Sequence, residues 1–372
     1  MSKKLRLGII SKDGKFGYSI RTKAFINVLK SKTAYDLFPI NQNDLIGNAQ
    51  PSIINALYNW LRWGKFGQWK EESFIEIAAQ NLDRYIEKNR LDFIQAETLT
   101  SAHIWLRSKK KCPCILDMHG LTCEEKELRG KISSNNEMKY WYSLQKEALH
   151  ECARIFVVSE KMKKYVLDIN PNANISILPN ASYPCKLKAE YKYPITPIYA
   201  GIFEYWENVE DFMALSKDSA IYNHVEKFSL IGDGRLKSQI LSMVNNHIKY
   251  YGRLSRFNTF LELSKSQIGV IPSTSDITRQ VASPIKLFDY LSVGLPVLTV
   301  DVGEWSSIVM DFDCGIVVEN TPKDLANGLL EFLDNARWNS MSENAKRLIV
   351  DRYNWDSVIS KTAFPVYNEM GS

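Results

Sequence analysis

Lys286 and Asp289 interrupt an otherwise apolar run that starts at Ser283, SPIKLFDYLSVGLPVLTV. Ser as N-cap followed by Pro, and Gly294 as a stop, predict a short helix that leads into a strand. The first turn of a helix carries unpaired N–H groups and the positive end of the dipole. Lys286 adds a charge there that costs about 0.3–1 kcal/mol, so a bound anion would offset it. The alternative is a surface ion pair between Lys286 and Asp289.

Short apolar runs alternate with longer segments of helical periodicity along the whole chain. The predicted strands are 5–10, 35–40, 92–96, 114–118, 154–159, 175–179, 197–201, 228–232, 248–252, 268–272, 296–300 and 315–319. Strands separated by helix-length segments are typical of parallel sheets with helices on both faces. Two successive series predict an α/β protein with two Rossmann-like domains. We expect the ligand beyond the carboxyl ends of the strands, in a cleft between the two sheets.

The predicted domain boundary lies in PNASYPCKLKAEYKYPITP, which is rich in Pro, Lys and Tyr and lacks helical periodicity. We expect an N-terminal domain at residues 1–182 and a C-terminal domain at 190–355. The last apolar pattern predicts a closing helix at about 356–372.

The charge of the chain is unevenly distributed. Residues 1–185 hold 28 Lys and Arg against 19 Asp and Glu, a net charge of +9, and the remaining residues carry −4. A basic half suggests an acidic partner such as phosphate or an anionic membrane surface, and a solvated basic surface is the alternative. No recognition fold for nucleic acid accompanies the basic residues, so we expect no nucleic-acid partner.

The six cysteines do not have the spacing of a disulfide framework. Cys112, Cys114 and Cys123 with His119 match no common zinc pattern, and we expect no metal. The first apolar stretch is too short for a signal peptide, and the sequence has no run of 18 apolar residues. The simplest expectation is a cytoplasmic protein.

TRQVASPIKLFDYLSVGLPVLT resembles the nucleotide-binding signature of the GT-B glycosyltransferases, in the retaining group 1, family-4-like branch. In order along the chain, VVSEKMKKYV and ISILPNAS resemble the passage into the hinge, and YAGIFEYWENVEDF, FSLIGDGRLKSQI and IKYYGRLSRFNTFLELSKSQIGVIPS resemble the donor domain. DRYNWDSVISKTAFPVYNE resembles the terminal helices, the last of which crosses back to the first domain. A lone GxG occurs by chance, whereas this ordered series is specific.

By this resemblance, the backbone of Lys286, Leu287 and Phe288 receives the diphosphate of a nucleotide sugar, with the Lys286 ammonium beside it. Asp289 lies where the family has an acidic residue that accepts from the ribose hydroxyls. The other residues that the resemblance assigns to the donor are Gly17, Gly232, Gly234, Arg253, Thr278 and Arg279. His119, at a strand end, lies where the family has a histidine that contacts the transferred sugar; a structural role is the alternative.

The implied mechanism is glycosyl transfer without a covalent protein nucleophile. Lys286, Arg279 and the helix start stabilise the charge of the leaving diphosphate, while His119 contacts the sugar. The acceptor hydroxyl attacks the same face, which gives retention, and closure about a hinge near 180–190 excludes water. The sequence shows no Asp-Asp metal motif, so we expect no cofactor beyond the donor substrate.

Two features depart from the family pattern. Val281 replaces the first of two glutamates eight residues apart, and GIFEYWENVED lacks the Arg and Lys that many members have after this strand. The donor is therefore open, with UDP favoured over GDP. A catalytically weak homologue that acts as a scaffold subunit of a polysaccharide assembly complex is an alternative, and a nucleotide-sugar epimerase is another.

ALYNWLRWGKFGQWK (56–70) mixes Trp and Phe with Lys and Arg. This composition suits an interfacial segment on an anionic bilayer, and equally an amphipathic helix packed on its own domain. The first case predicts a lipid-linked saccharide acceptor and a peripheral position at the inner face of the membrane. The second predicts a soluble saccharide. Both suit the synthesis of a cell-surface polysaccharide or glycoconjugate.

Overall fold

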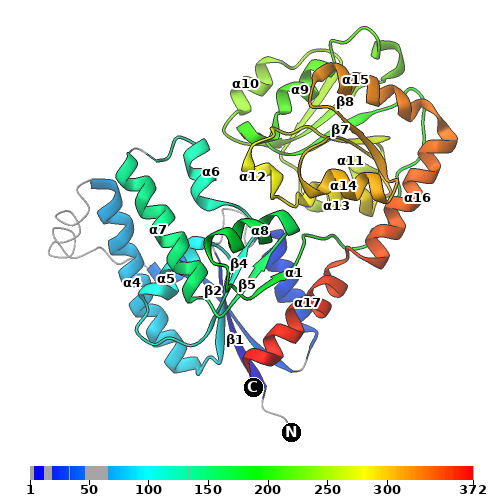
Figure 1. Ribbon diagram of the computed structural model, residues 1–372. Helices are drawn as coiled ribbons and strands as arrows, with labels where there is room; N and C mark the ends of the chain where they lie inside the picture. The colour runs from blue at the N-terminus through cyan, green and yellow to red at the C-terminus, as the bar shows by residue number, and fades with distance from the viewer. Residues whose placement is uncertain (1–3, 12–18, 33, 47–65, 133, 372) are drawn as a thin grey trace. The chain divides into compact units, whose positions relative to one another are not determined.

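The structure is a computed structural model that describes residues 4–11, 19–32, 34–46, 66–132 and 134–371. The chain divides into two compact units (Figure 1). Unit 1 comprises Met1–Leu178 and Ile359–Ser372, and unit 2 comprises Pro179–Val358.

Unit 1 is built on a parallel six-stranded sheet of order β2-β1-β3-β4-β5-β6. Its strands are β1 (Leu5–Ser11), β2 (Tyr35–Asn41), β3 (Phe93–Ala96), β4 (Cys114–Met118), β5 (Arg154–Val157) and β6 (Ile175–Ile177). Every residue of β3 and β4 is buried, as expected for central strands of a sheet covered on both faces.

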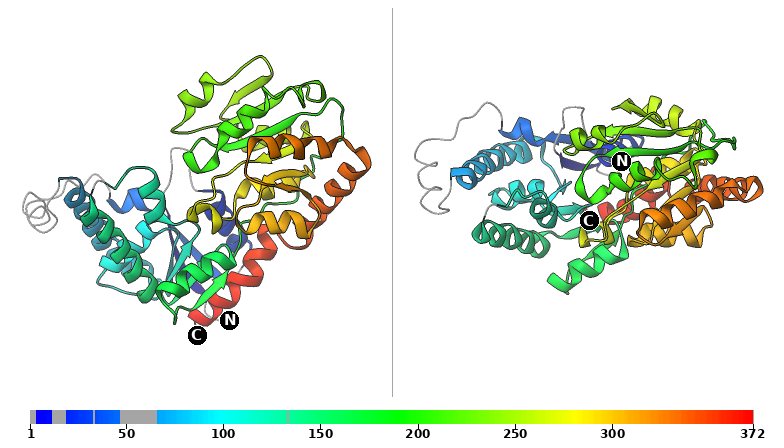
Figure 2. Two further views of the ribbon diagram at one scale, coloured as in Figure 1. Left: turned by 45° about the horizontal axis from the view of Figure 1, so that its top comes forward. Right: turned by 90° about the horizontal axis from the view of Figure 1, so that it is seen from above.

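The helices of unit 1 cover both faces of this sheet. They are α1 (Ile20–Lys30), α2 (Gln42–Ile46), α4 (Phe66–Asn89), α5 (Leu99–Arg107), α6 (Thr122–Leu128), α7 (Asn135–Glu151) and α8 (Glu160–Ile169). In the views of Figures 1 and 2, α4, α5 and α7 form one layer. Ser19 caps α1 and Thr98 caps α5, since each side chain accepts a hydrogen bond from a backbone N–H of the first turn. Helix α5 begins just beyond the carboxyl end of β3.

The C-terminal helix α17 (Trp355–Met370) belongs to unit 1 from Ile359 on and packs directly on its sheet (Figure 2). Tyr367 is fully buried, and its hydroxyl donates to the side chain of Gln95 in β3. The hydroxyl of Tyr35 donates to Asn368 at 2.9 Å. These contacts attach the end of the chain to the sheet with which the sequence begins, as the resemblance implies.

Unit 2 repeats the same architecture with sheet order β12-β11-β10-β7-β8-β9. Its strands are β7 (Pro197–Ile202), β8 (Phe228–Asp233), β9 (Ile248–Gly252), β10 (Ile268–Ile271), β11 (Val297–Val300) and β12 (Gly315–Val318), all parallel. Its helices are α9 (Val209–Leu215), α10 (Lys237–Ser242), α11 (Arg256–Ser264), α12 (Ile277–Gln280), α13 (Ile285–Ser292), α14 (Gly303–Asp311), α15 (Pro322–Leu330) and α16 (Asn335–Asp351). Short 3-10 turns lie at Tyr205–Glu207, Tyr222–His224 and Glu331–Leu333.

The structure confirms the predicted α/β fold with two Rossmann-like parts. All twelve strands lie within two residues of their predicted positions. The prediction that Ser283 caps the helix is wrong: α13 begins at Ile285 after Pro284, and the Ser283 hydroxyl instead accepts from the N–H of Asn180 at 3.3 Å. Gly294, with φ of 71°, supplies the predicted left-handed stop.

The structure describes only part of the segment that was expected to contact a membrane. Residues 56–65 of the aromatic and basic segment 56–70 lie outside the described residues, and α4 begins at Phe66. Across the described ranges, none of the helices combines the length and apolar character needed to cross a bilayer. All six cysteines are free.

Candidate functional site

Helix α13 carries the residues on which the predicted nucleotide site depends. Its fully buried side chains are Leu287, Phe288, Tyr290 and Leu291. Tyr290 accepts a hydrogen bond from the backbone N–H of Ala200 in β7 at 2.8 Å. This contact holds the helix against β7 and places Lys286, in its first turn, close to the carboxyl end of that strand.

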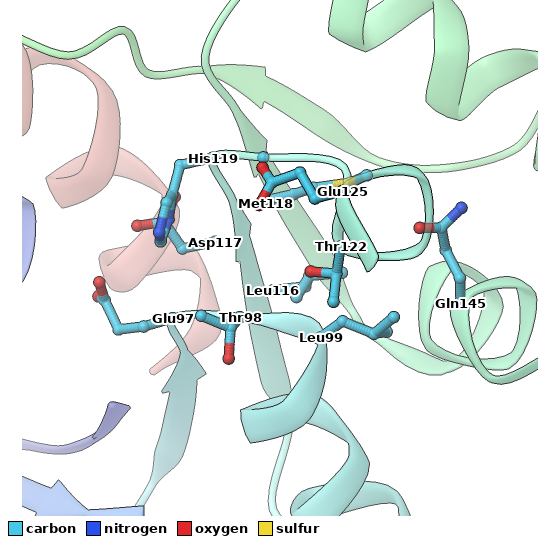
Figure 3. Close-up of a pocket in the computed structure, with 11 residues that line it drawn as sticks. Glu97, Thr98, Leu99, Leu116, Asp117, Met118, His119, Thr122, Glu125 and Gln145 are labelled. Carbon is cyan, nitrogen blue, oxygen red and sulfur yellow. The ribbon is translucent and has the colours of Figure 1, made fainter. Parts of the chain in front are cut away.

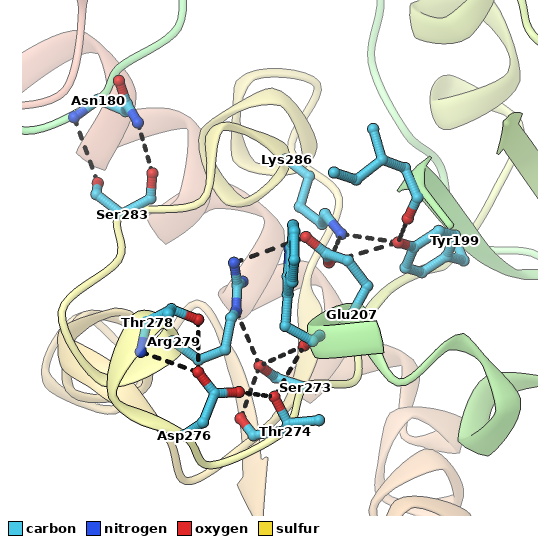
Figure 4. Close-up of polar contacts among 12 residues, drawn as sticks. Asn180, Tyr199, Glu207, Ser273, Thr274, Asp276, Thr278, Arg279, Ser283 and Lys286 are labelled. Carbon is cyan, nitrogen blue, oxygen red and sulfur yellow. Dashed lines mark hydrogen bonds and ion pairs between the residues drawn. The ribbon is translucent and has the colours of Figure 1, made fainter. Parts of the chain in front are cut away.

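Lys286 lies in a polar cluster inside unit 2 (Figure 4). Its ammonium donates to the carboxylate of Glu207 and, at 3.0 Å, to the hydroxyl of Tyr199, and it lies 4.4 Å from the centroid of the Tyr199 ring. The side chain of Lys286 is 10% exposed and that of Glu207 is 6% exposed. A methyl group at Gly201 would come within 2.7 Å of the lysine nitrogen, so the chain leaves room for the ammonium there.

Arg279, in α12, is the second cation of this cluster. Its Nη1 lies 3.6 Å from the other oxygen of Glu207, and its Nε donates to the hydroxyl of Ser273 at 3.1 Å. The guanidinium lies 5.1 Å from the ring of Trp305. Its Nη2 is buried and has no hydrogen-bond partner among the described residues. A buried donor without a partner is costly, and an anion oxygen would satisfy it.

The electrostatics of the cluster follow from burial and from the sharing of one carboxylate. Burial by itself raises the pKa of Glu207, but Lys286 and Arg279 outweigh it, so its pKa lies below the ordinary value. Burial lowers the pKa of Lys286, and the attraction of Glu207 only partly opposes this shift. Two cations face one carboxylate, which leaves the cluster with an excess of positive charge beyond the ends of β7 and β10.

Thr278, which was predicted to contact phosphate or sugar, lies next to Arg279 but forms its hydrogen bonds with Asp276. Both its backbone N–H, at 2.9 Å, and its hydroxyl donate to Asp276, the N-cap of α12. This cap fixes the short helix and, through it, the position of Arg279. The structure therefore gives Thr278 a local positioning contact.

Asp289 forms a separate network one turn further along α13. Its carboxylate accepts from the hydroxyl of Ser182 at 2.8 Å and from both terminal nitrogens of Arg256 at 2.7 and 3.1 Å. Burial raises the pKa of Asp289, and Arg256 and Ser182 oppose this shift. A ribose hydroxyl that donates to Asp289 would therefore bind to a carboxylate that already accepts from Arg256. The sequence analysis did not identify Arg256.

The sequence analysis expected the backbone of Lys286, Leu287 and Phe288, at the start of α13, to receive the diphosphate. The N–H of Leu287 already donates to the carbonyl of Pro284 at 3.1 Å. The side chains of Leu287 and Phe288 are fully buried, so only their main-chain atoms could meet a diphosphate. Val281, where the family has a glutamate, is also buried and brings no polar group to the site.

Gly232, Gly234 and Arg253 follow the neighbouring strands β8 and β9. A methyl group at Gly232 would lie 1.9 Å from the carbonyl oxygen of Gly201, and one at Gly234 would lie 2.4 Å from that of Phe203. Both glycines thus allow the chain after β8 to pack closely on the chain after β7. Arg253 is exposed directly after β9.

In unit 1, His119 follows β4 and lines a cavity of about 140 Å³ (Figure 3). Burial lowers the pKa of His119, so the neutral imidazole is favoured. Gly17 lies outside the described residues. The structure thus brings Lys286 and Arg279 together, sets Asp289 in a neighbouring network on the same helix, and places His119 in the other unit.

One group of described residues has the spacing of a potential metal site: ligand atoms of Glu97, Asp117 and His119 lie within 4.8 Å of one another. Both oxygens of Asp117 accept from Arg21, through Nη2 at 2.7 Å and Nε at 2.8 Å. The guanidinium beside Asp117 repels a metal ion, so the charges of this group disfavour one.

Sequence reasoning did not identify Glu207, which contacts both predicted catalytic cations of unit 2. The available signal was GIFEYWENVED, where the expected Arg and Lys are missing and an acidic residue follows the strand. Its partner Lys286 lies 79 residues away, so local spacing does not reveal the pair.

Two six-stranded parallel sheets, each flanked by helices, and buried cations beyond the strand ends of the second sheet define an α/β enzyme of GT-B architecture. The family model of group 1 glycosyl transferases matches residues 196–335, and that of glycosyltransferase family 4 matches residues 65–181. The chain belongs to the GT-B glycosyltransferases and is an enzyme that transfers a sugar.

Solved structures share this fold over nearly the whole chain. Sucrose-phosphate synthase from Thermosynechococcus elongatus has a TM-score of 0.75 at 14% identity, with 99% of each chain covered. Anabaena HepE in complex with UDP-glucose has a TM-score of 0.69 at 12% identity, with 98% of this chain and 100% of that chain covered. A trehalose-6-phosphate structure from E. coli, bound with UDP-2-fluoro glucose, has a TM-score of 0.69 at 11% identity, with 99% of each chain covered. No curated protein sequence matches the chain significantly.

Proposed function

We propose that this enzyme transfers a sugar from a nucleotide-diphosphate sugar to a saccharide or lipid-linked saccharide acceptor, in the synthesis of a cell-surface polysaccharide or glycoconjugate. The observation that carries the proposal is the cluster of Lys286, Arg279 and Glu207. It holds more positive than negative charge, it is buried, and Arg279 offers a donor that no described residue satisfies. Such a cluster suits the diphosphate of a sugar nucleotide.

Lys286 and Arg279 act on the leaving group. When the bond between the sugar and the diphosphate breaks, negative charge develops on the phosphate oxygen, and cations already in place stabilise it without reorganisation. Glu207 keeps both cations oriented before the donor arrives and prevents their mutual repulsion. Asp289, with Arg256 and Ser182, forms a second polar group on the same helix, which suits the ribose.

The acceptor hydroxyl attacks the anomeric carbon without a covalent protein nucleophile, and its proton leaves with the diphosphate. Attack on the face from which the diphosphate departs gives retention, which the resemblance implies. His119 contacts the transferred sugar as a neutral imidazole.

UDP is the favoured nucleotide. Support comes from structural neighbours whose bound ligands are UDP-glucose in HepE and UDP-2-fluoro glucose in the E. coli structure. No metal or further cofactor takes part in the proposed reaction, because Lys286 and Arg279 supply the positive charge at the diphosphate.

The two acceptor classes differ in whether the enzyme binds membranes through residues 56–70. Cosedimentation with vesicles that contain anionic lipid separates them. Binding that is lost when the three Trp residues of this segment are changed to Ala supports a lipid-linked acceptor at the inner face of the membrane. If the wild-type enzyme stays in the supernatant, the result supports a soluble saccharide acceptor.

The experiment for the proposed function is a thermal-shift screen with UDP-, GDP- and ADP-sugars, followed by assay of slow donor hydrolysis. A donor at 100 times its dissociation constant stabilises the enzyme by about 2.7 kcal/mol. Lys286→Ala and Arg279→Ala should abolish both the shift and the release of nucleoside diphosphate. The matched control Lys265→Ala, an exposed lysine of an i,i+3 ion pair, should retain both.

Equal shifts in all three variants would refute the assignment of the diphosphate to this cluster. Donor binding without turnover for any acceptor would refute the transferase function and favour a scaffold role.

A further inference from the structure

The cavity in unit 1 contains an acidic residue that the sequence analysis did not single out. Glu97 follows β3 directly, is 1% exposed, and lies with Asp117 and His119 on one side of the cavity, with Gln145 on the other (Figure 3). Glu97, Asp117 and His119 lie at or directly after the carboxyl ends of β3 and β4, which are neighbours in the sheet, and Gln145 comes from α7.

The charges around Glu97 do not balance if every group is ionised. Arg21 is paired with Asp117 through two hydrogen bonds, and its Nη2 also donates to the carbonyl of Leu178 at 3.0 Å. From the described residues, Glu97 accepts hydrogen bonds from two neutral donors, the Thr22 hydroxyl at 2.9 Å and the Gln95 amide at 2.8 Å. Within the part of the chain that the structure describes, the two buried carboxyl groups thus share the Arg21 cation.

The surroundings of Glu97 favour the protonated form of its carboxyl group. Burial, and then the neighbouring charge of Asp117, raise the pKa of Glu97 to about 8, although Arg21, Gln95 and Thr22 oppose the shift. At neutral pH Glu97 is therefore a hydrogen-bond donor, which an ionised carboxylate is not.

We propose that Glu97, in its neutral form, donates a hydrogen bond to a saccharide hydroxyl group that enters this cavity and also contacts His119. The inference rests on the proposed function and adds a specificity-determining residue to it. The ligand atoms of Glu97, Asp117 and His119 lie within 4.8 Å of one another, so one hydroxyl group can reach both Glu97 and His119. Nδ1 of His119 is buried, has no hydrogen-bond partner in the described ranges, and can accept from that hydroxyl.

The groups that face Glu97 come from several elements. They are Arg21 and Thr22 of α1, Gln95 of β3, Asp117 and His119 at the end of β4, Glu125 of α6 and Tyr367 of α17. Burial keeps His119 neutral and raises the pKa of Tyr367 well above its ordinary range. These two described neighbours of Glu97 are therefore not expected to change their charge close to pH 8.

The experiment is the pH dependence of kcat/KM, measured for donor hydrolysis without acceptor and for transfer to the acceptor. The wild-type enzyme should lose kcat/KM above about pH 8, as Glu97 loses its proton. Glu97→Gln, which donates at every pH, should remove this decline, and the exposed control Glu87→Gln should retain it. A decline in hydrolysis places the hydroxyl on the donor sugar, whereas a decline confined to transfer places it on the acceptor.

Thr22→Val gives an independent test that does not alter Glu97 itself. It removes a hydrogen bond that lowers the pKa of Glu97, so the alkaline decline should move to higher pH. Glu97→Ala should raise the KM of the affected saccharide by about tenfold, the value of one hydrogen bond of about 1.4 kcal/mol.

The proposal is overturned if Glu97→Gln and Thr22→Val both keep the wild-type pH profile. It is also overturned if EDTA abolishes activity, Mg²⁺ or Mn²⁺ restores it and Glu97→Gln removes this response, since Glu97 is then a metal ligand. Absence of turnover by the wild-type enzyme with every donor would instead refute the proposed function.

Discussion

Glu207→Ala removes the carboxylate that pairs with both Lys286 and Arg279. The three side chains are 6%, 10% and 8% exposed, respectively, so the variant leaves two cations buried next to each other in unit 2. Breaking a buried ion pair by removal of one partner costs about 3–5 kcal/mol, because the remaining charge stays uncompensated. For a domain of this size, such a loss lowers the melting temperature by about 6–20 °C.

Differential scanning calorimetry of the wild-type enzyme and the variant, with and without UDP, measures this effect. The diphosphate can replace the missing carboxylate, so UDP should raise the melting temperature of Glu207→Ala more than that of the wild type. Glu226→Ala, which removes an exposed ion pair with Lys192 at 2.8 Å, should cost at most about 1 kcal/mol. A Glu207→Ala variant as stable as this control would refute the view that the carboxylate holds the two cations.

Two further predictions concern the buried charges. Arg21→Leu should destabilise unit 1 by about 3–5 kcal/mol in urea unfolding, because Asp117 is left without its cation; a loss below about 1 kcal/mol would contradict a structural role of the pair. The folded-state pKa of Glu207 lies below its unfolded value, so its contribution to stability is present above the unfolded value and disappears as the pH falls through the folded one. Glu207→Gln should therefore weaken the acid dependence of unfolding, and an unchanged slope of stability against pH below about pH 4.5 would contradict this.

The strands and the two-part α/β fold could be predicted from the sequence because each strand is a local apolar run. Cys114–Met118 and Val297–Val300, for example, are entirely buried and are apolar except for Asp117 and Thr299. The stop at Gly294 was also a local property of one residue. The start of α13 was misplaced because Ser283 bonds to the distant residue Asn180 instead of to its own helix.

The candidate site was harder to predict from the sequence than the fold, because its decisive contacts join distant parts of the chain. Lys286 was predicted from its position in the first turn of one helix and Arg279 from the family resemblance, but their shared partner Glu207 lies in the 3-10 turn after β7. Asp289 was identified, whereas Arg256, its partner 33 residues earlier, has no local pattern that connects the two. The raised pKa of Glu97 depends on burial and on Asp117, which no local pattern near Glu97 reveals.

The most direct test of the account is a crystal structure of the enzyme with UDP. We predict that an oxygen of the diphosphate lies within hydrogen-bond distance of Nη2 of Arg279, with the Lys286 ammonium beside the same group. A diphosphate bound elsewhere, with Nη2 of Arg279 still lacking an anion partner, would contradict the central claim.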